Sequence, residues 1–148
     1  MANSQAMCTS FKADLLNGVH AFSAAYRAAD TFKAALYLAS GSLGAATTAY
    51  STTSEVSGTG YTAGGVAVTF GTAPSTSGTS AIVTPSANIV FSNVTLTTSF
   101  DTVLLYNASA TGKNAVSVHT FGAQTVTAGT LTLTMPTNAV GTALIEID

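Results

Sequence analysis

Two histidines are the residues of this chain best suited to acid–base chemistry, because an unperturbed imidazole has a pKa of about 6.5. They are His20 and His119. A nucleophilic triad would need one of them beside a serine and a carboxylate. The chain has no Gly-x-Ser-x-Gly motif to hold such a serine on a strained turn. His119 falls on the strand face opposite Val116 and Val118, so we expect it at a surface or an interface and predict no catalytic residue.

The other groups that could bind a metal do not form a local pattern. The acidic residues are Asp14, Asp30, Glu55, Asp101, Glu146 and Asp148. No two of them have the spacing of a metal-binding loop, and a glycosidase pair could arise only through the fold. The one cysteine, Cys8, can form neither an intrachain disulfide nor a metal site alone. We therefore expect no enzyme, no metal and no cofactor.

A glycine-rich segment, Gly58-Thr59-Gly60-Tyr61-Thr62-Ala63, imitates the fingerprint of dinucleotide-binding proteins. That fingerprint needs a strand before it and a helix after it, because the helix N-terminus binds the pyrophosphate. Here a strand pattern follows, with Val66, Val68 and Phe70 on one face. No acidic residue lies about 20 positions further on, and there is no Gly-Lys-Ser/Thr motif. These differences favour a structural loop.

This loop, residues 54–65, divides an alanine-rich first third from a threonine-rich remainder. Its glycines allow positive φ angles or a close approach to another chain. Glu55, near Tyr61, has two interpretations: it contacts another subunit, or its carboxylate accepts N–H bonds from the loop, and we favour the second. The residues for which we expect a structural or interface role are Glu55, Gly58, Gly60, Tyr61, Gly64 and Gly65.

Charged residues are scarce in this chain. Its 148 residues suit a single domain, yet only 7% are charged and the net charge is −2. The usual charged fraction is about 25%. Four basic residues cannot form a phosphate-neutralising stripe, so we expect no nucleic acid and no membrane as partners. A surface with so little charge favours burial against copies of the chain or against another protein.

No targeting or membrane segment is evident in the sequence. The start lacks the basic and apolar regions of a secretory signal. The most apolar long window, residues 19–50, is interrupted by His20, Arg27, Asp30 and Lys33 and is no membrane span. We expect one domain, in which residues 1–18 form an arm and a short helix and residues 19–148 form the body.

The N-terminal segment is expected to consist of an arm and a short docking helix. Residues 1–9 are typical of a flexible arm, and Ser10 can cap a short helix that Gly18 ends in a left-handed conformation. Two helical turns cannot stand alone, so the helix must dock on the body or on a neighbour. Its expected docking residues are Phe11, Leu15 and Leu16. Deletion of residues 1–18 should then abolish partner binding and leave the body folded.

The body has the pattern of an antiparallel β protein. Strands are expected at 31–38, 66–70, 80–84, 87–98, 101–107, 114–121, 129–135 and 142–148. A turn-rich link covers residues 71–78, and Ala128-Gly129 is expected to be a turn. The apolar phase slips at Ser92-Asn93, which indicates a bulge or a tight turn. Short strands at this spacing predict a mainly β fold, an antiparallel sandwich that is jelly-roll-like, with one short N-terminal helix.

Three stretches carry a family resemblance. Residues 30–37 (DTFKAALY), 48–50 (TAY) and 54–65 (SEVSGTGYTAGG) resemble a recurring family of small virion structural proteins from tailed bacteriophages. The segments CTSFK at 8–12 and LLNG at 15–18 fit the same pattern, so the resemblance is strongest over residues 8–70. The family defines no catalytic residues. Its members resemble head decoration or cement proteins and, in other cases, neck or tail components.

The resemblance implies a homodimer or homotrimer that clamps the major capsid protein on the capsid surface, after assembly in the bacterial host cytoplasm. Many weak contacts with a repeating lattice would bind strongly together. One alternative is a neck, tail or fibre-base component of the virion. A second is a carbohydrate-binding module for host recognition, although the chain has no Trp for sugar stacking.

Overall fold

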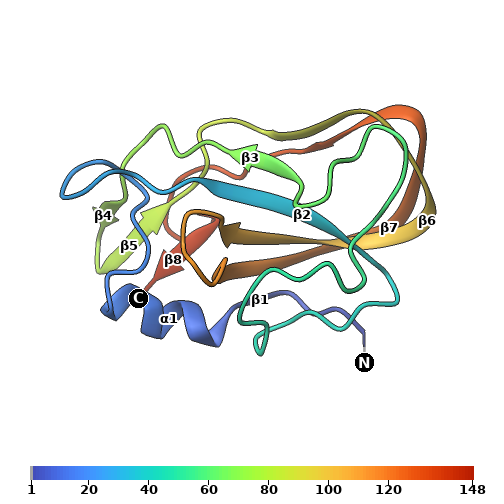
Figure 1. The fold of residues 1–148 in the computed structure, drawn as a ribbon. Coiled ribbons are helices and arrows are strands. Elements are labelled where there is room, and N and C mark those ends of the chain that lie inside the picture. Colours follow the sequence, from blue (N-terminus) through green and yellow to red (C-terminus); the bar gives the residue numbers. More distant parts are fainter. Residues whose placement is uncertain (1) are drawn as a thin grey trace.

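The computed structural model describes residues 2–148 as a mainly β protein with one short helix (Figure 1). The antiparallel strands form a five-stranded sheet in the order β1-β7-β6-β2-β3 and a three-stranded sheet in the order β4-β5-β8. The elements are β1 (Ala6–Met7), α1 (Thr9–Leu16), β2 (Phe32–Leu38), β3 (Val66–Val68), β4 (Ser75–Ser77), β5 (Ser80–Val83), β6 (Ile89–Asn107), β7 (Ala115–Leu133) and β8 (Ile145–Ile147). The expected mainly β, antiparallel class with one N-terminal helix is confirmed.

Two strands, β6 and β7, dominate the architecture. Each is 19 residues long, and together they replace four of the expected shorter strands. The separations expected between 98 and 101 and at Ala128-Gly129 are wrong, because irregular register absorbs the phase slips without ending the ladder. Asn93 and Ala128 have positive φ angles of 54° and 46° at these irregularities, and the bulge expected at Ser92-Asn93 is confirmed.

The β6–β7 hairpin folds over on itself and forms both layers of the body. In Figure 1 it runs along the top of the molecule, turns at the right and returns beneath. Ile89 and Leu133 from the outer half face Val103 and Leu105 from the returning half across a cavity. One continuous hydrogen-bonded ribbon therefore supplies two facing apolar surfaces.

The N-terminal residues are not a free arm. β1 pairs with β7 in the register Ala6↔Val118, and the Asn3 side chain donates hydrogen bonds to the Leu38 carbonyl and to Asp101. Cys8 is fully buried. The expected flexible arm is therefore wrong, because its polar groups have partners on the body and its one thiol lies in the core.

Helix α1 divides the three expected docking residues. Phe11 is fully buried against its own chain, Leu15 is half-buried against the core, and Leu16 is 92% exposed. Phe11 therefore cannot dock on a neighbour, and deletion of residues 1–18 would remove part of the core, so the expectation of an intact body is wrong. The left-handed stop at Gly18 is confirmed by a φ of 68°. The expected cap at Ser10 is wrong, because Cys8 precedes the helix in an extended conformation with no side-chain cap.

A cluster of phenylalanines holds α1 and the segment 17–31 to the sheets. Phe22 stacks on Phe32 with ring centroids 4.5 Å apart, and Phe70 meets both edge-on. Phe11 lies edge-on to Phe22 at 6.1 Å. The link expected at 71–78 contains β4, which pairs with β5. The last expected strand, 142–148, is shortened to β8.

Candidate functional site

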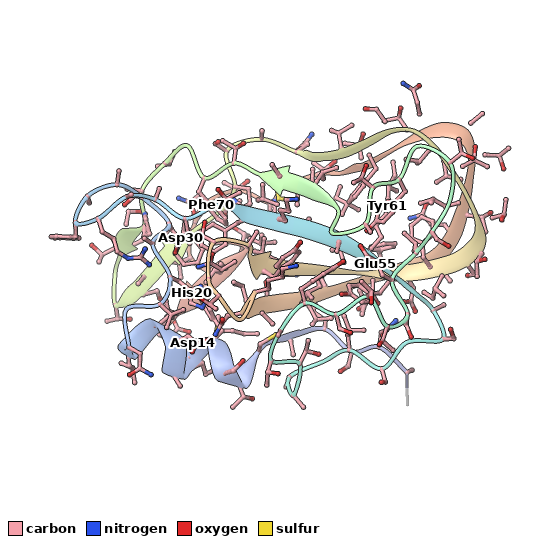
Figure 2. All side chains as sticks on the ribbon, in the orientation of Figure 1. Asp14, His20, Asp30, Glu55, Tyr61 and Phe70 are labelled. Carbon is pink, nitrogen blue, oxygen red and sulfur yellow. The ribbon has the colours of Figure 1, made fainter. Side chains whose placement is uncertain are left out.

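The glycine-rich loop is organised around the carboxylate of Glu55 (Figure 2). Its Oε1 accepts hydrogen bonds from the Tyr61 hydroxyl at 2.8 Å and from the Gly64 amide at 2.7 Å. Its Oε2 accepts a bond from the Tyr50 hydroxyl at 2.7 Å. The carboxylate thus accepts donors of its own chain, including a loop N–H, as the favoured interpretation predicted.

The loop glycines bring the loop against the strands of the same chain. A Cβ atom at Gly58 would overlap with the Thr95 carbonyl oxygen of β6, and one at Gly65 would overlap with the Ala34 carbonyl oxygen of β2. Gly60 makes a similar approach to the Asn93 carbonyl oxygen, with a φ of 79°. These glycines are required for packing within the chain, so the expected approach to another chain does not explain them.

The chemistry of this loop is that of a structural centre. Burial, together with the Glu55 carboxylate, raises the pKa of Tyr50 and of Tyr61, so both hydroxyls stay protonated and donate at neutral pH. The Tyr106 hydroxyl donates to the Gly64 carbonyl at 2.8 Å from the neighbouring strand. Three donors of the same chain thus fix the Glu55 carboxylate, two at Oε1 and one at Oε2.

A second polar centre surrounds His20, which sequence reasoning did not single out as a structural node. Its side chain has no exposed surface, and its Nε2 lies 3.6 Å from Oδ2 of Asp14 on α1. Its Nδ1 lies 3.2 Å from the side-chain nitrogen of Asn107. The Asn107 oxygen accepts two backbone N–H groups, which fixes the amide orientation, so Nδ1 accepts and Nε2 carries the proton. Burial lowers the pKa of His20, although Asp14 opposes that shift.

The same Asn107 amide connects this centre to the loop at 19–30. It donates to Oδ2 of Asp30 at 2.8 Å, and that oxygen also accepts the Ala21 amide at 2.8 Å. Arg27 binds both Asp30 oxygens, at 2.9 and 3.0 Å, and donates to the Val19 carbonyl at 2.8 Å. Burial raises the pKa of Asp30, but the bonds from Arg27, Ala21 and Asn107 prevail and lower it. The network locks the loop on the body, and within residues 2–148 the polar partners of His20 are Asn107 and Asp14 rather than a serine.

His119 forms a pair with Ser117 inside the folded hairpin. The Ser117 hydroxyl lies 2.8 Å from Nε2 of His119, and a cavity of about 200 Å³ lined mostly by apolar side chains adjoins the histidine. His119, which was expected at a surface or an interface, is half-buried, and burial lowers its pKa. The reason is the fold-over of β6 and β7, which covers this face. In residues 2–148, no carboxylate hydrogen-bonds to His119, so the pair lacks the third group of a triad.

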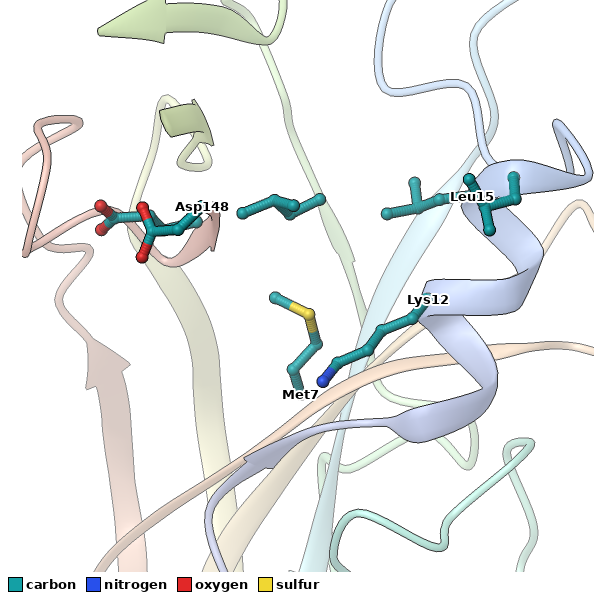
Figure 3. A pocket seen from close by; sticks show the side chains of 7 residues that line it. Met7, Lys12, Leu15 and Asp148 are labelled. Atoms are coloured by element: carbon teal, nitrogen blue, oxygen red, sulfur yellow. The ribbon is translucent and has the colours of Figure 1, made fainter. Parts of the chain in front are cut away.

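A groove of about 580 Å³ separates α1 from β8 (Figure 3). Its apolar lining comes from Met7 of β1, from Leu15 and Leu16 of α1, and from Ile147 of β8. Lys12 stands on the helix side, whereas Glu146 and Asp148 stand on the strand side. The sequence indicated Leu15 and Leu16 as docking residues, but it did not indicate the β8 wall, whose only signal was an apolar C-terminal strand.

One aromatic side chain is presented to solvent. Among the aromatic residues within 2–148, Tyr26 is the one that is fully exposed. It lies at the tip of the loop that Asp30 and Arg27 fix. A second groove, of about 630 Å³, lies along this loop and is lined by Leu15, Arg27 and Pro74, among others. Leu15 also lines the α1–β8 groove, so the two apolar regions adjoin.

Comparison with known protein families, with curated proteins and with solved structures found no match. In the described part of the chain, no three His, Cys, Asp or Glu side chains gather where they could hold a metal ion. None of the helices within residues 2–148 has the length and apolar character needed to cross a membrane.

Proposed function

We propose that this chain is a non-enzymatic structural protein of a tailed-bacteriophage virion, a decoration or cement protein that binds the capsid lattice and stabilises it. The resemblance of residues 8–70 supplies the class of protein and the partner, the major capsid protein. The proposal includes two further points: copies of the chain associate with one another, and the fold is jelly-roll-like. The polar centres at Glu55 and His20 support a structural role, because the hydrogen bonds of Glu55 hold the glycine-rich loop and those of Asn107 hold the loop at 19–30.

The observation that carries the proposal is the presentation of Tyr26. An exposed tyrosine on a mobile loop would lose conformational entropy on binding, but the Arg27–Asp30 pair and the Asn107 amide already fix this loop. Tyrosine is a common anchor of protein interfaces. With only 7% of residues charged, the surrounding surface offers little electrostatic attraction, so shape and apolar contact must provide binding.

The contact of one copy with the lattice is small in this proposal. One tyrosine and the adjoining groove provide far less area than a stable interface of about 1,600 Å². Repetition over the lattice compensates, since linked copies bind with a high effective concentration. This explains how a chain with few charges and one exposed aromatic residue can stabilise a large shell.

Copy number in purified particles tests the location. Closed symmetry makes the answer discrete: a lattice decorator is present on the order of hundreds of times, and a neck, tail or fibre-base component on the order of a dozen times. Quantitative mass spectrometry of particles measures this directly. Hundreds of copies are expected. A dozen would move the protein to the portal or tail axis, and absence from particles would reject the proposal.

Tyr26→Ala tests the surface. We expect the variant to lose at least about tenfold in affinity for capsids that lack the protein, because anchor tyrosines dominate interfaces of this kind. Co-sedimentation with such capsids measures the affinity. Val90→Ala is the matched control, since Val90 is 40% exposed on β6, away from the loop. Equal capsid binding by the two variants would exclude the Tyr26 loop as the contact.

A further inference from the structure

The groove between α1 and β8 has walls of opposite charge. Glu146 and Asp148 stand on the β8 side and Lys12 on the α1 side, with an apolar floor between them. Within residues 2–148 the one lysine or arginine that forms an ion pair is Arg27, with Asp30, so Lys12 makes none. The floor is incompletely covered, because Leu16 is 92% and Ile147 is 41% exposed. A surface of this kind suits a partner that brings an apolar side chain and a cation to the acidic wall.

The free edge of β8 is a poor place for another strand. β8 is the outer strand of its sheet and pairs only with β5, in the register Ile82↔Glu146. If two copies joined there around a two-fold axis at the middle of β8, Glu146 would face Glu146 of the second copy. Like charges directly opposite each other destabilise strand pairs, and charged residues protect sheet edges. The acidic wall therefore disfavours sheet extension between copies.

Helix α1 carries the complementary features. Lys12 and Leu16 are four residues apart, so they lie on one face of the helix, one turn from each other. Both are exposed. Of the other three cations, Arg27 is bound to Asp30, Lys113 lies over the Tyr50 ring at 5.2 Å, and Lys33 is half-buried on β2. Lys12 is thus the cation that stands beside a protruding apolar side chain.

We propose that the α1–β8 groove is the surface through which two copies of this chain associate around a two-fold axis. Leu16 of each copy enters the groove of the other, and Lys12 of each copy meets the Glu146 and Asp148 wall of the other. A two-fold axis makes both contacts twice, because an isologous interface must complement itself. Each apolar protrusion covers a floor that a single copy leaves open.

This inference rests on the proposed function and deepens it, because paired copies would double the lattice contacts. It also names a second copy of the chain as the partner of the predicted docking helix. Its test needs no capsid. The purified full chain is measured by sedimentation velocity over a concentration series. A concentration-dependent dimer is expected. A monomer throughout, or a trimer, overturns the inference, whereas particle copy number decides the proposed function separately.

Substitutions at exposed positions give the matched comparison. Leu16→Asp should raise the dimer dissociation constant at least about tenfold, whereas Val90→Asp, on the far layer, should leave it unchanged. Far-ultraviolet circular dichroism checks that both variants fold. Equal dissociation constants for the two variants overturn the inference.

A charge exchange tests the two-fold geometry itself. Lys12→Glu gives a copy with two acidic walls, and the double variant Glu146→Lys/Asp148→Lys gives a copy with two basic walls, so each variant alone should dissociate. Their mixture should form a heterodimer, because both cross-contacts then join opposite charges. Native mass spectrometry distinguishes the species. Dimers of either variant alone, or no heterodimer in the mixture, overturn the inference.

Discussion

Glu55 accepts hydrogen bonds from two tyrosine hydroxyls and one backbone amide in the half-buried centre of its loop. Glu55→Gln replaces one acceptor oxygen with an NH₂ group, which then faces a donor. We expect the free energy of unfolding to fall by about 1–3 kcal/mol, because a buried donor loses its partner. Urea denaturation measures this loss.

Glu146→Gln is the control for that substitution. The Glu146 Oε2 accepts the exposed Gly141 amide, so the control should cost less than about 1 kcal/mol. If the two variants were equally stable, the loop would not depend on the carboxylate of Glu55.

Both histidines should make the protein less stable in mild acid. Burial lowers the pKa of His20 and of His119 below the usual value, so the unfolded chain binds protons that the folded chain does not. Stability is therefore complete above the unfolded pKa of about 6.5 and falls as the pH drops through it. Urea midpoints from about pH 7.5 to pH 5.5 should decrease, and His119→Gln should flatten this dependence. A flat profile for the unmodified protein would contradict the prediction.

The two polar centres differ in how far the sequence could predict them. Glu55 lies within nine residues of its partners, so local turn chemistry indicated its role. His20 meets Asn107, 87 residues away in the sequence, and that contact depends on where the β6–β7 turn places the amide. No spacing rule connects such residues, and the sequence indicated Asn107 only as the last residue of the strand expected at 101–107.

Among the elements, β6 and β7 show why strand periodicity located apolar residues but misplaced strand ends. The phase slip at Ser92-Asn93 was visible in the sequence, and Ala128-Gly129 was predicted as a turn, yet each pattern is compatible with either a turn or a bulge. The partner strand decides between them. Here an equally long partner continues past each slip, which a single strand's sequence cannot reveal.

The irregularity at Ala128 in β7 predicts that glycine substitutions at two positions of this strand change the stability in opposite directions. Ala128 has a φ of 46°, a conformation that glycine adopts at no cost. Ala128→Gly should therefore stabilise the protein by up to about 1 kcal/mol. Ala123→Gly in the same exposed strand, where φ is not positive, should destabilise it by about 0.5–1 kcal/mol. Urea midpoints compare the two, and the same sign for both would contradict the left-handed bulge.

At the scale of the whole molecule, the two sheets share one core. Val83 of β5 and Ile145 of β8, in the smaller sheet, belong to the same buried cluster as Phe11 of α1 and Leu104 of β6, in the larger sheet. We expect one cooperative thermal transition, with equal calorimetric and van't Hoff enthalpies of roughly 100 kcal/mol near 60 °C. Scanning calorimetry measures both. Two transitions would mean that the small sheet unfolds separately.

The fold class followed from the sequence, but the topology did not. Strands that alternate apolar residues with threonine are typical of antiparallel sheets that have one solvated face. The fold-over of one hairpin depends on the curl of two long strands, and the N-terminal β1 depends on an edge of β7 that only the finished sheet provides. The N-terminal residues before the helix had no pattern of their own, and residues 2–9 take their place in the structure through tertiary contacts.

Cys8 lies at the joint between β1 and α1, fully buried, and burial raises the pKa of its thiol to about 11. A thiol reagent can therefore react only when this joint detaches from the body. Since the chain has a single cysteine, the rate at which Cys8 is labelled under native conditions measures how often the N-terminal segment detaches. A partner bound to α1 would slow the labelling of Cys8, so the labelling rate reports whether the α1 surface is occupied.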